Sequence, residues 1–185
     1  MKLDKNNLID ILILSSRVLL SWTLLNYGYG KISGIQFGIS QKEMLLPLKD
    51  VGLFRLSWFL FDHEPFKSFI GISQIISGLL ILYNRTLIIG IFISIPIFLN
   101  ILIIDITFIQ QSGFVWRLSW YLFLDTLILW YYRDKIFLML KTITNGITLK
   151  YKYPIWVFLS IPILSIGLDF FIFLIKYLVD KLLGF

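Results

Sequence analysis

Apolar residues occupy five long blocks of this chain, and short polar stretches separate the blocks. The blocks are residues 8–30, 66–83, 86–108, 114–132 and 154–176. A helix of about 20 mostly apolar residues crosses the hydrocarbon core of a bilayer. Because backbone polar groups in lipid must be satisfied within their own segment, each block is predicted to be a transmembrane helix. The pattern therefore predicts an all-α membrane protein, with residues 1–185 forming a single multi-pass membrane domain.

The longest polar connection, residues 31–65, contains one further apolar stretch. Residues 51–61 read VGLFRLSWFLF, which is aromatic and apolar but too short to span a bilayer. Such a segment is typical of a helix that lies in the membrane interface. The alternative is a lid that folds back over a binding pocket.

Composition limits the chemistry of the chain. It has no cysteine, which excludes disulfides, dithiol redox pairs and thiolate-bound iron–sulfur clusters. Its one histidine, His63, excludes bis-histidine haem and histidine-rich metal sites, so we expect no covalent cofactor and no metal. The net charge of +6 belongs to the connections between blocks. On a membrane protein this charge faces the lipid bilayer surface and sets topology, and nucleic-acid binding is not expected.

Two charged residues inside the blocks are expected at similar depth. Arg17 in the first block and Asp125 in the fourth lie at comparable distances from the same end, because consecutive helices run antiparallel. Charged groups in membrane helices tend to face the bundle interior and to pair. We therefore predict a buried Arg17–Asp125 ion pair that holds helices together. On the second block, Gly71, Gln74 and Gly78 at i, i+3 and i+7 predict a close helix contact.

A second polar cluster is predicted near the opposite end, beneath the long connection. It combines cations, amides and an aromatic hydroxyl, and its candidate ligand-binding residues are Tyr27, Lys31, Gln74, Asn100, Asp105 and Arg117. Two interpretations of this cluster remain open. It is either a ligand site or a set of polar groups that hold the helices together.

Several stretches resemble the DoxX-like family of integral membrane proteins. Residues 26–31 (NYGYGK), followed by Gln36 and Phe37, resemble the end of that family's first helix. Residues 71–86 (GISQIISGLLILYNRT) resemble its second helix, and Gly90 with Asn100 and Asp105 looks like its third. The resemblance covers about residues 17–138. It implies a four-helix transmembrane bundle, to which the fifth block and the interfacial segment would be additions.

The resemblance also implies a location and a function. The implied location is the bacterial inner membrane as a multi-pass protein, and the distribution of basic residues slightly favours a cytoplasmic N-terminus. The name-giving DoxX members are small subunits of a thiosulfate:quinone oxidoreductase. The expectation is therefore a non-catalytic membrane subunit or anchor, with a protein complex as its partner.

Two alternative functions stay open at this stage. One is a quinone-linked oxidoreductase component, in which donors of the second polar cluster bind a quinone; the lack of cysteine excludes a dithiol route. The other is a small proton or anion transporter, whose path would be lined by Arg17, Asp105, Asp125 and Asp169. The sequence identifies no catalytic residue and leaves open whether the protein is an enzyme.

Overall fold

The computed structural model describes residues 5–146 and 151–183, and every regular element in these ranges is helical. In chain order the elements are α1 (Lys5–Ile32), α2 (Gln41–Met44), the 3₁₀ turn η1 (Leu48–Asp50), α3 (Leu53–Phe61), α4 (Phe66–Leu82), α5 (Leu87–Ile104), the π-helix η2 (Asp105–Ile109), α6 (Ser112–Tyr131), α7 (Arg133–Thr144) and α8 (Ile155–Leu183). The chain divides into two compact units, Met1–Leu140 and Lys141–Phe185. The predicted all-α class is confirmed, while the single-domain organisation stays a prediction.

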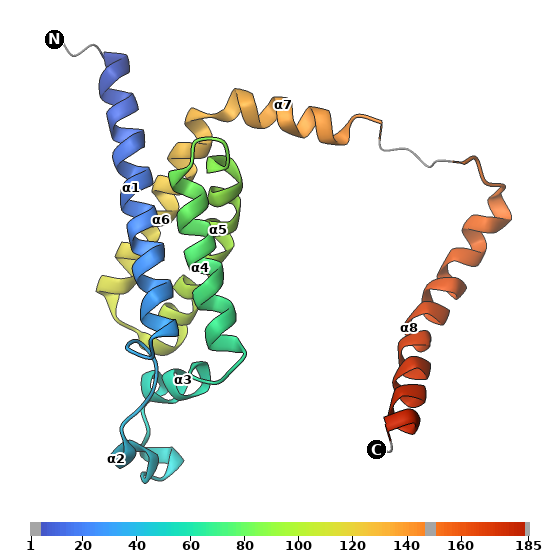
Figure 1. Cartoon of the computed structure of the whole chain (residues 1–185), viewed down its shortest axis with the longest axis horizontal. Helices are drawn as coiled ribbons and strands as arrows, with labels where there is room; N and C mark the ends of the chain where they lie inside the picture. The colour runs from blue at the N-terminus through green and yellow to red at the C-terminus, as the bar shows by residue number, and fades with distance from the viewer. Residues whose placement is uncertain (1–4, 147–150, 184–185) are drawn as a thin grey trace. The chain divides into compact units, whose positions relative to one another are not determined.

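Four helices of the first unit, α1, α4, α5 and α6, form an up-and-down bundle (Figure 1). Each packs on the next in the chain, and α6 returns to contact α1. Leu20, Leu24, Ile91 and Phe98 are fully buried in their shared interior, together with the polar residues Gln74, Ser94 and Asp125. The Phe98 ring also packs on Tyr121 of α6, with 5.4 Å between ring centroids. The four-helix arrangement expected of residues 17–138 is therefore present, whereas features specific to the DoxX-like family remain a prediction.

The tightest helix contact joins α1 to α4 through small residues. A Cβ atom added to Gly28 would lie 2.5 Å from the backbone oxygen of Gly71, which is closer than Cβ contacts occur in proteins. One added to Gly78 would lie 3.1 Å from the backbone oxygen of Ser21, whose hydroxyl donates a 2.7 Å hydrogen bond to the Gly78 carbonyl. The glycine face predicted on the second block is thus a contact with α1.

Three helical segments are long and apolar enough to cross a membrane, namely Asn7–Ile32, Leu87–Ile109 and Ile155–Leu183. A fourth is obtained if α3 and α4, bent by 83° at their junction, count as one span. The sequence predicted five spans, and two of them fall short of this measure. Helix α4 has only 17 residues, and the tryptophan, tyrosine and serine residues of α6 lower its hydropathy. Several long apolar helices remain, as in a multi-pass membrane protein.

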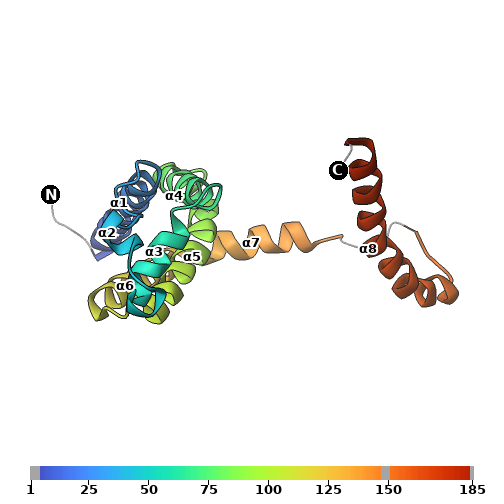
Figure 2. The same ribbon diagram turned by 90° about the horizontal axis from the view of Figure 1, so that it is seen from below.

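Helices α3 and α7 lie outside the four-helix bundle. Helix α3 forms within the predicted segment 51–61 and lies across the bundle end at which α1 ends and α4 begins (Figures 1 and 2). Helix α7 was not predicted, and the polar loop that the sequence predicted over residues 141–153 overlaps only its last turn. Ile136, Met139, Leu140 and Ile143 follow at i, i+3, i+4 and i+7, which is the pattern of an amphipathic helix. Residues 147–150 of that predicted loop lie outside the described residues.

The second unit consists mainly of α8. This helix has 29 residues, extends beyond the predicted block 154–176, and includes Pro162. None of its described residues is buried, and Asp169 lies near its middle.

Candidate functional site

A cavity of about 60 Å³ lies beneath α3. Its polar lining consists of Lys31, Gln36, Asn100 and Asp105, and its aromatic lining consists of Phe37, Trp58, Phe61 and Phe66. We call it the α3 cavity. It has room for a few water molecules or a small polar group, whereas drug-sized ligands occupy about 300–1,000 Å³.

Lys31 supplies the cation of this cavity from the last turn of α1. The residue is only 3% exposed, and its Nζ donates a 3.0 Å hydrogen bond to Oε1 of Gln36. The same nitrogen lies 5.4 Å from the ring centroid of Tyr27 and 5.3 Å from that of Phe37, which places it between two aromatic faces. The chain can cover Lys31 in this way because the amide of Gln36 turns back to the Gly30 carbonyl. The C-terminal end of a helix also favours a cation.

Asp105 supplies the carboxylate at the point where α5 changes into the π-helix η2. It is 4% exposed and interacts electrostatically with Lys31. Among the described residues, no ion pair within 4.0 Å joins the two side chains. The wide turn closes where Gln110, at φ 55°, donates its amide to the Asp105 carbonyl. Lys31 and Asp105 therefore both line the α3 cavity without forming a direct ion pair.

The structure brings Tyr27 and Arg117 to the same end of the bundle. The Tyr27 hydroxyl interacts electrostatically with Arg117, Tyr121 and Asp105. Arg117 is exposed on α6. Of the residues that the sequence predicted for this cluster, Lys31, Asn100 and Asp105 line the cavity, whereas Tyr27 and Arg117 do not.

Gln74 does not belong to this cluster. It is fully buried on the core face of α4, beside Ser77 and Gly78, and does not line the α3 cavity. Neither polar atom of its side-chain amide has a hydrogen-bond partner in the part of the chain that the structure describes. Its predicted place near the end of the bundle is therefore wrong, because Gln74 lies near the middle of the 17-residue helix α4.

An apolar groove between α4 and α5 adjoins the cavity. It encloses about 350 Å³ and is lined by Phe66, Phe69, Ile70, Ser73, Pro96, Ile97, Asn100 and Ile101. Phe66, Ile70, Asn100 and Ile101 also line the α3 cavity. Asn100 is exposed and makes no hydrogen bond to the residues that the structure describes. The Asn100 amide therefore lies at the junction of the polar α3 cavity and the apolar α4–α5 groove.

The predicted ion pair between Arg17 and Asp125 does not form, since each residue has other partners. The Arg17 guanidinium donates to the carbonyls of Ile81 and Leu82, at 3.2 and 2.9 Å. Asp125 accepts a 2.9 Å hydrogen bond from the Ser94 hydroxyl. The physical reason is that α4 ends at Leu82, and the last carbonyls of a helix have no donor within it. Arg17 lies level with those carbonyls and satisfies them.

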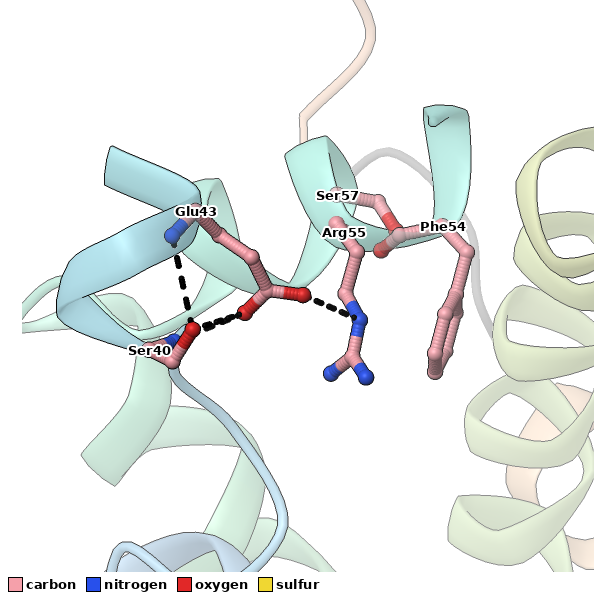
Figure 3. Close-up of polar contacts among 5 residues, drawn as sticks. All are labelled: Ser40, Glu43, Phe54, Arg55 and Ser57. Carbon is pink, nitrogen blue, oxygen red and sulfur yellow. Dashed lines mark hydrogen bonds and ion pairs between the residues drawn. The ribbon is translucent and has the colours of Figure 1, made fainter. Parts of the chain in front are cut away.

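A polar tie that the sequence analysis missed connects α2 to α3 (Figure 3). Oε2 of Glu43 accepts hydrogen bonds from the backbone amide and the hydroxyl of Ser40, and its Oε1 lies 2.9 Å from Nε of Arg55. These Ser40 hydrogen bonds and the Arg55 charge lower the pKa of the Glu43 carboxyl. The S-x-x-E spacing of a capping box was the signal that could have identified Ser40 and Glu43.

The aromatic residues of the cavity lining were also missed as individuals. Trp58 and Phe61 were recognised only as part of the 51–61 segment, although Phe37 packs on both, with ring centroids 5.7 and 5.9 Å apart. Their spacing in α3 places them on one helix face, but the sequence alone does not say which bundle end that face covers.

Comparison with protein-family models, with curated proteins and with solved structures gives no match to this chain. The resemblance to DoxX-like proteins therefore remains a prediction from the sequence.

Proposed function

We propose that this chain is a non-catalytic membrane subunit that binds the polar head of a lipophilic molecule at the α3 cavity, with a quinone as the first ligand class to test. The observation that carries the proposal is the position of Asn100, which lines both the polar cavity and the apolar α4–α5 groove. A molecule with a polar head and an apolar body fits such a pair of spaces. Its body would occupy the groove, whose lining residue Phe69 is 71% exposed.

The donors at this junction suit a ligand that accepts hydrogen bonds. A lysine ammonium has three N–H donors, and Lys31 gives one of them to Gln36. The amide of Asn100 adds donors that no described residue uses. Quinone carbonyls accept hydrogen bonds, and binding through carbonyls requires only an apolar slot and one or two donors.

The subunit part of the proposal draws on α8. This helix is apolar and 29 residues long, and within its own unit it buries none of its described residues. Asp169 lies near its middle, and a charged side chain exposed to lipid at that depth is costly. A helix of a partner complex would cover Asp169 and remove that cost. The resemblance to DoxX-like proteins of the bacterial inner membrane favours the same role.

The proposal is tested by ligand binding to the full-length protein in neutral detergent. The first measurement is mass spectrometry of the mildly extracted protein, to detect a co-purifying quinone or partner polypeptide. The second is titration with decylubiquinone, for which we expect saturable binding. Asn100→Leu should weaken this binding about fivefold, since one neutral hydrogen bond is lost.

A matched control separates this site from a general loss of polarity. Asn26→Leu makes the same chemical change on α1, where the Asn26 amide donates to the Trp22 carbonyl of its own helix. It should leave decylubiquinone binding unchanged. Absence of saturable binding, or equal losses in the two variants, would remove the proposal.

A further inference from the structure

A second pocket, of about 330 Å³, lies where α4 turns into α5. It is lined by Arg17, Asn84, Leu87, Ile88, Tyr132 and Lys135. We call it the hairpin pocket. Among the described residues, its lining contains two cations, an amide and a phenol, and no acidic side chain. The proposed function of the α3 cavity makes no use of it.

Arg17 is a buried cation that has no anionic partner among the described residues. The residue is 7% exposed, and the atoms that receive its hydrogen bonds, the carbonyl oxygens of Ile81 and Leu82, are neutral. No carboxylate of the described residues lies within 4.0 Å of it. A charge in such a position is costly unless it is paired. Its Nε and Nη2 are occupied, whereas Nη1 makes no hydrogen bond to a described residue and is free for a ligand.

The first turn of α5 adds a second electropositive element to the pocket. Thr86, which precedes the helix, provides no side-chain cap. The first amide of α5 with an acceptor within the helix is that of Gly90, which donates to the Thr86 carbonyl at 2.9 Å. The amides of Leu87 and Ile88 therefore have no acceptor inside the helix. The unsatisfied amides of a helix N-terminus attract anions.

Lys135 approaches the pocket from α7. It is exposed, and its Nζ lies 5.4 Å from the ring centroid of Tyr132. Groups from three elements, α1, α5 and α7, thus bring positive charge or unused donors to one space. A ligand that matches them is an anion with several acceptor oxygens, which is the chemistry of a phosphate group.

The surroundings favour a lipid as the source of that phosphate. Phe137 and Leu138, which follow Lys135 in α7, are 68% and 66% exposed. A helix with exposed apolar residues beside basic ones lies in the headgroup layer of a membrane. Basic pockets between membrane helices bind anionic lipid head groups. We propose that the hairpin pocket binds the phosphate group of an anionic phospholipid, which supplies the counter-charge of Arg17.

The test is lipid binding to the full-length protein, delipidated in neutral detergent and observed by native mass spectrometry. The probes are phosphatidylglycerol, phosphatidylcholine and inorganic phosphate. We expect phosphatidylglycerol to bind most tightly and Lys135→Gln to weaken it about tenfold, because a charged hydrogen bond is lost. Lys135→Arg should retain binding. Arg17 is left intact because it also satisfies the end of α4.

Arg133→Gln is the matched control. It removes the same charge from the same exposed end of α7, but Arg133 lies outside the pocket lining. Its effect should stay below about twofold in salt, which screens exposed charges. Equal losses in Arg133→Gln and Lys135→Gln would show general surface attraction and overturn the site. Undiminished binding in Lys135→Gln would overturn it as well. Inorganic phosphate that binds as tightly as phosphatidylglycerol would overturn the lipid assignment.

Discussion

The two ends of the four-helix bundle place buried charge in different ways. At the α3 end, the cation of Lys31 and the carboxylate of Asp105 line the same α3 cavity and interact electrostatically. At the hairpin end, Arg17 and Lys135 line a pocket that has no acidic side chain. The first end is balanced by its own residues and can admit a neutral polar head. The second end requires its counter-charge from outside the described residues, and a membrane lipid can provide it.

The largest effect is expected from removing one charge at the balanced end. Lys31→Met leaves the Asp105 carboxylate without a nearby cation, and Asp105→Asn leaves the Lys31 ammonium without a nearby anion. We expect each to lower the free energy of unfolding by about 3 kcal/mol, at the low end of the range for buried pairs because the cavity admits water. The double variant should lose clearly less than the sum. Unfolding in detergent, followed through a double-mutant cycle, measures this coupling.

The hairpin end provides the contrast to that cycle. Arg17→Met and Asp125→Asn should be additive within about 0.5 kcal/mol, because the two side chains contact different partners. Strong coupling between Arg17 and Asp125, or additive effects of the Lys31 and Asp105 substitutions, would contradict the proposed difference between the two ends.

A smaller loss of stability is expected when the close helix packing near either end is disturbed. Gly28→Ala places a Cβ atom 2.5 Å from the Gly71 carbonyl near the α3 end, and Gly90→Ala places one 2.7 Å from the Ile81 amide near the hairpin end. Neither backbone atom can move without displacing its helix, so we expect a loss of about 2 kcal/mol in each variant. Gly28→Ala should mainly impair decylubiquinone binding, and Gly90→Ala should mainly impair phosphatidylglycerol binding.

Gly30→Ala is the control for both glycine variants. A Cβ atom there would have its nearest neighbour at 3.7 Å, which is an ordinary contact. It should change neither stability nor binding by a measurable amount. If Gly28→Ala and Gly90→Ala each weakened the binding of both ligands equally, the two ends of the bundle would not respond to packing changes independently.

Long-range features of this fold were predictable where one physical rule dominated. The apolar blocks predicted the helices, since lipid and core packing both require uninterrupted apolar runs. The glycines of the second block predicted the contact with α1, because only small residues allow that approach. Asn100, Asp105 and Lys31 were correctly grouped, since antiparallel helices bring residues near the same end together.

The failures have two causes, which are the rotation of helices about their axes for Arg17 and Asp125, and the depth along the helix for Gln74. Depth along the bundle placed Arg17 level with Asp125, but the side chains have different partners, with Arg17 bonded to α4 and Asp125 to Ser94 of α5. Gln74 was placed correctly on the contact face of its helix and wrongly at the bundle end. Sequence periodicity gives the polar face of each helix, while the partner of that face depends on how four helices pack together.

The smallest predicted effect concerns the tie between α2 and α3 and its response to pH. Hydrogen bonds from Ser40, together with the charge of Arg55, lower the pKa of the Glu43 carboxyl in the folded protein. A carboxyl with a lowered pKa stabilises the folded state above its unfolded pKa of about 4.3, and this contribution is lost as the pH falls through the folded value. We therefore expect residues 40–61 to lose amide-exchange protection below about pH 4.

The amide-exchange measurement has controls both within the tie region and at the hairpin end. Glu43→Gln should reduce protection of residues 40–61 at neutral pH and remove most of its acid dependence, whereas Asp50→Asn, on the same connection but outside the tie, should do neither. The hairpin pocket has no acidic group in its lining, so acid should leave the protection around Asn84 unchanged. An unaltered acid response in Glu43→Gln would assign the loosening of α3 to another carboxyl, with Asp62, paired with Lys67 at 2.9 Å, as the next one to replace.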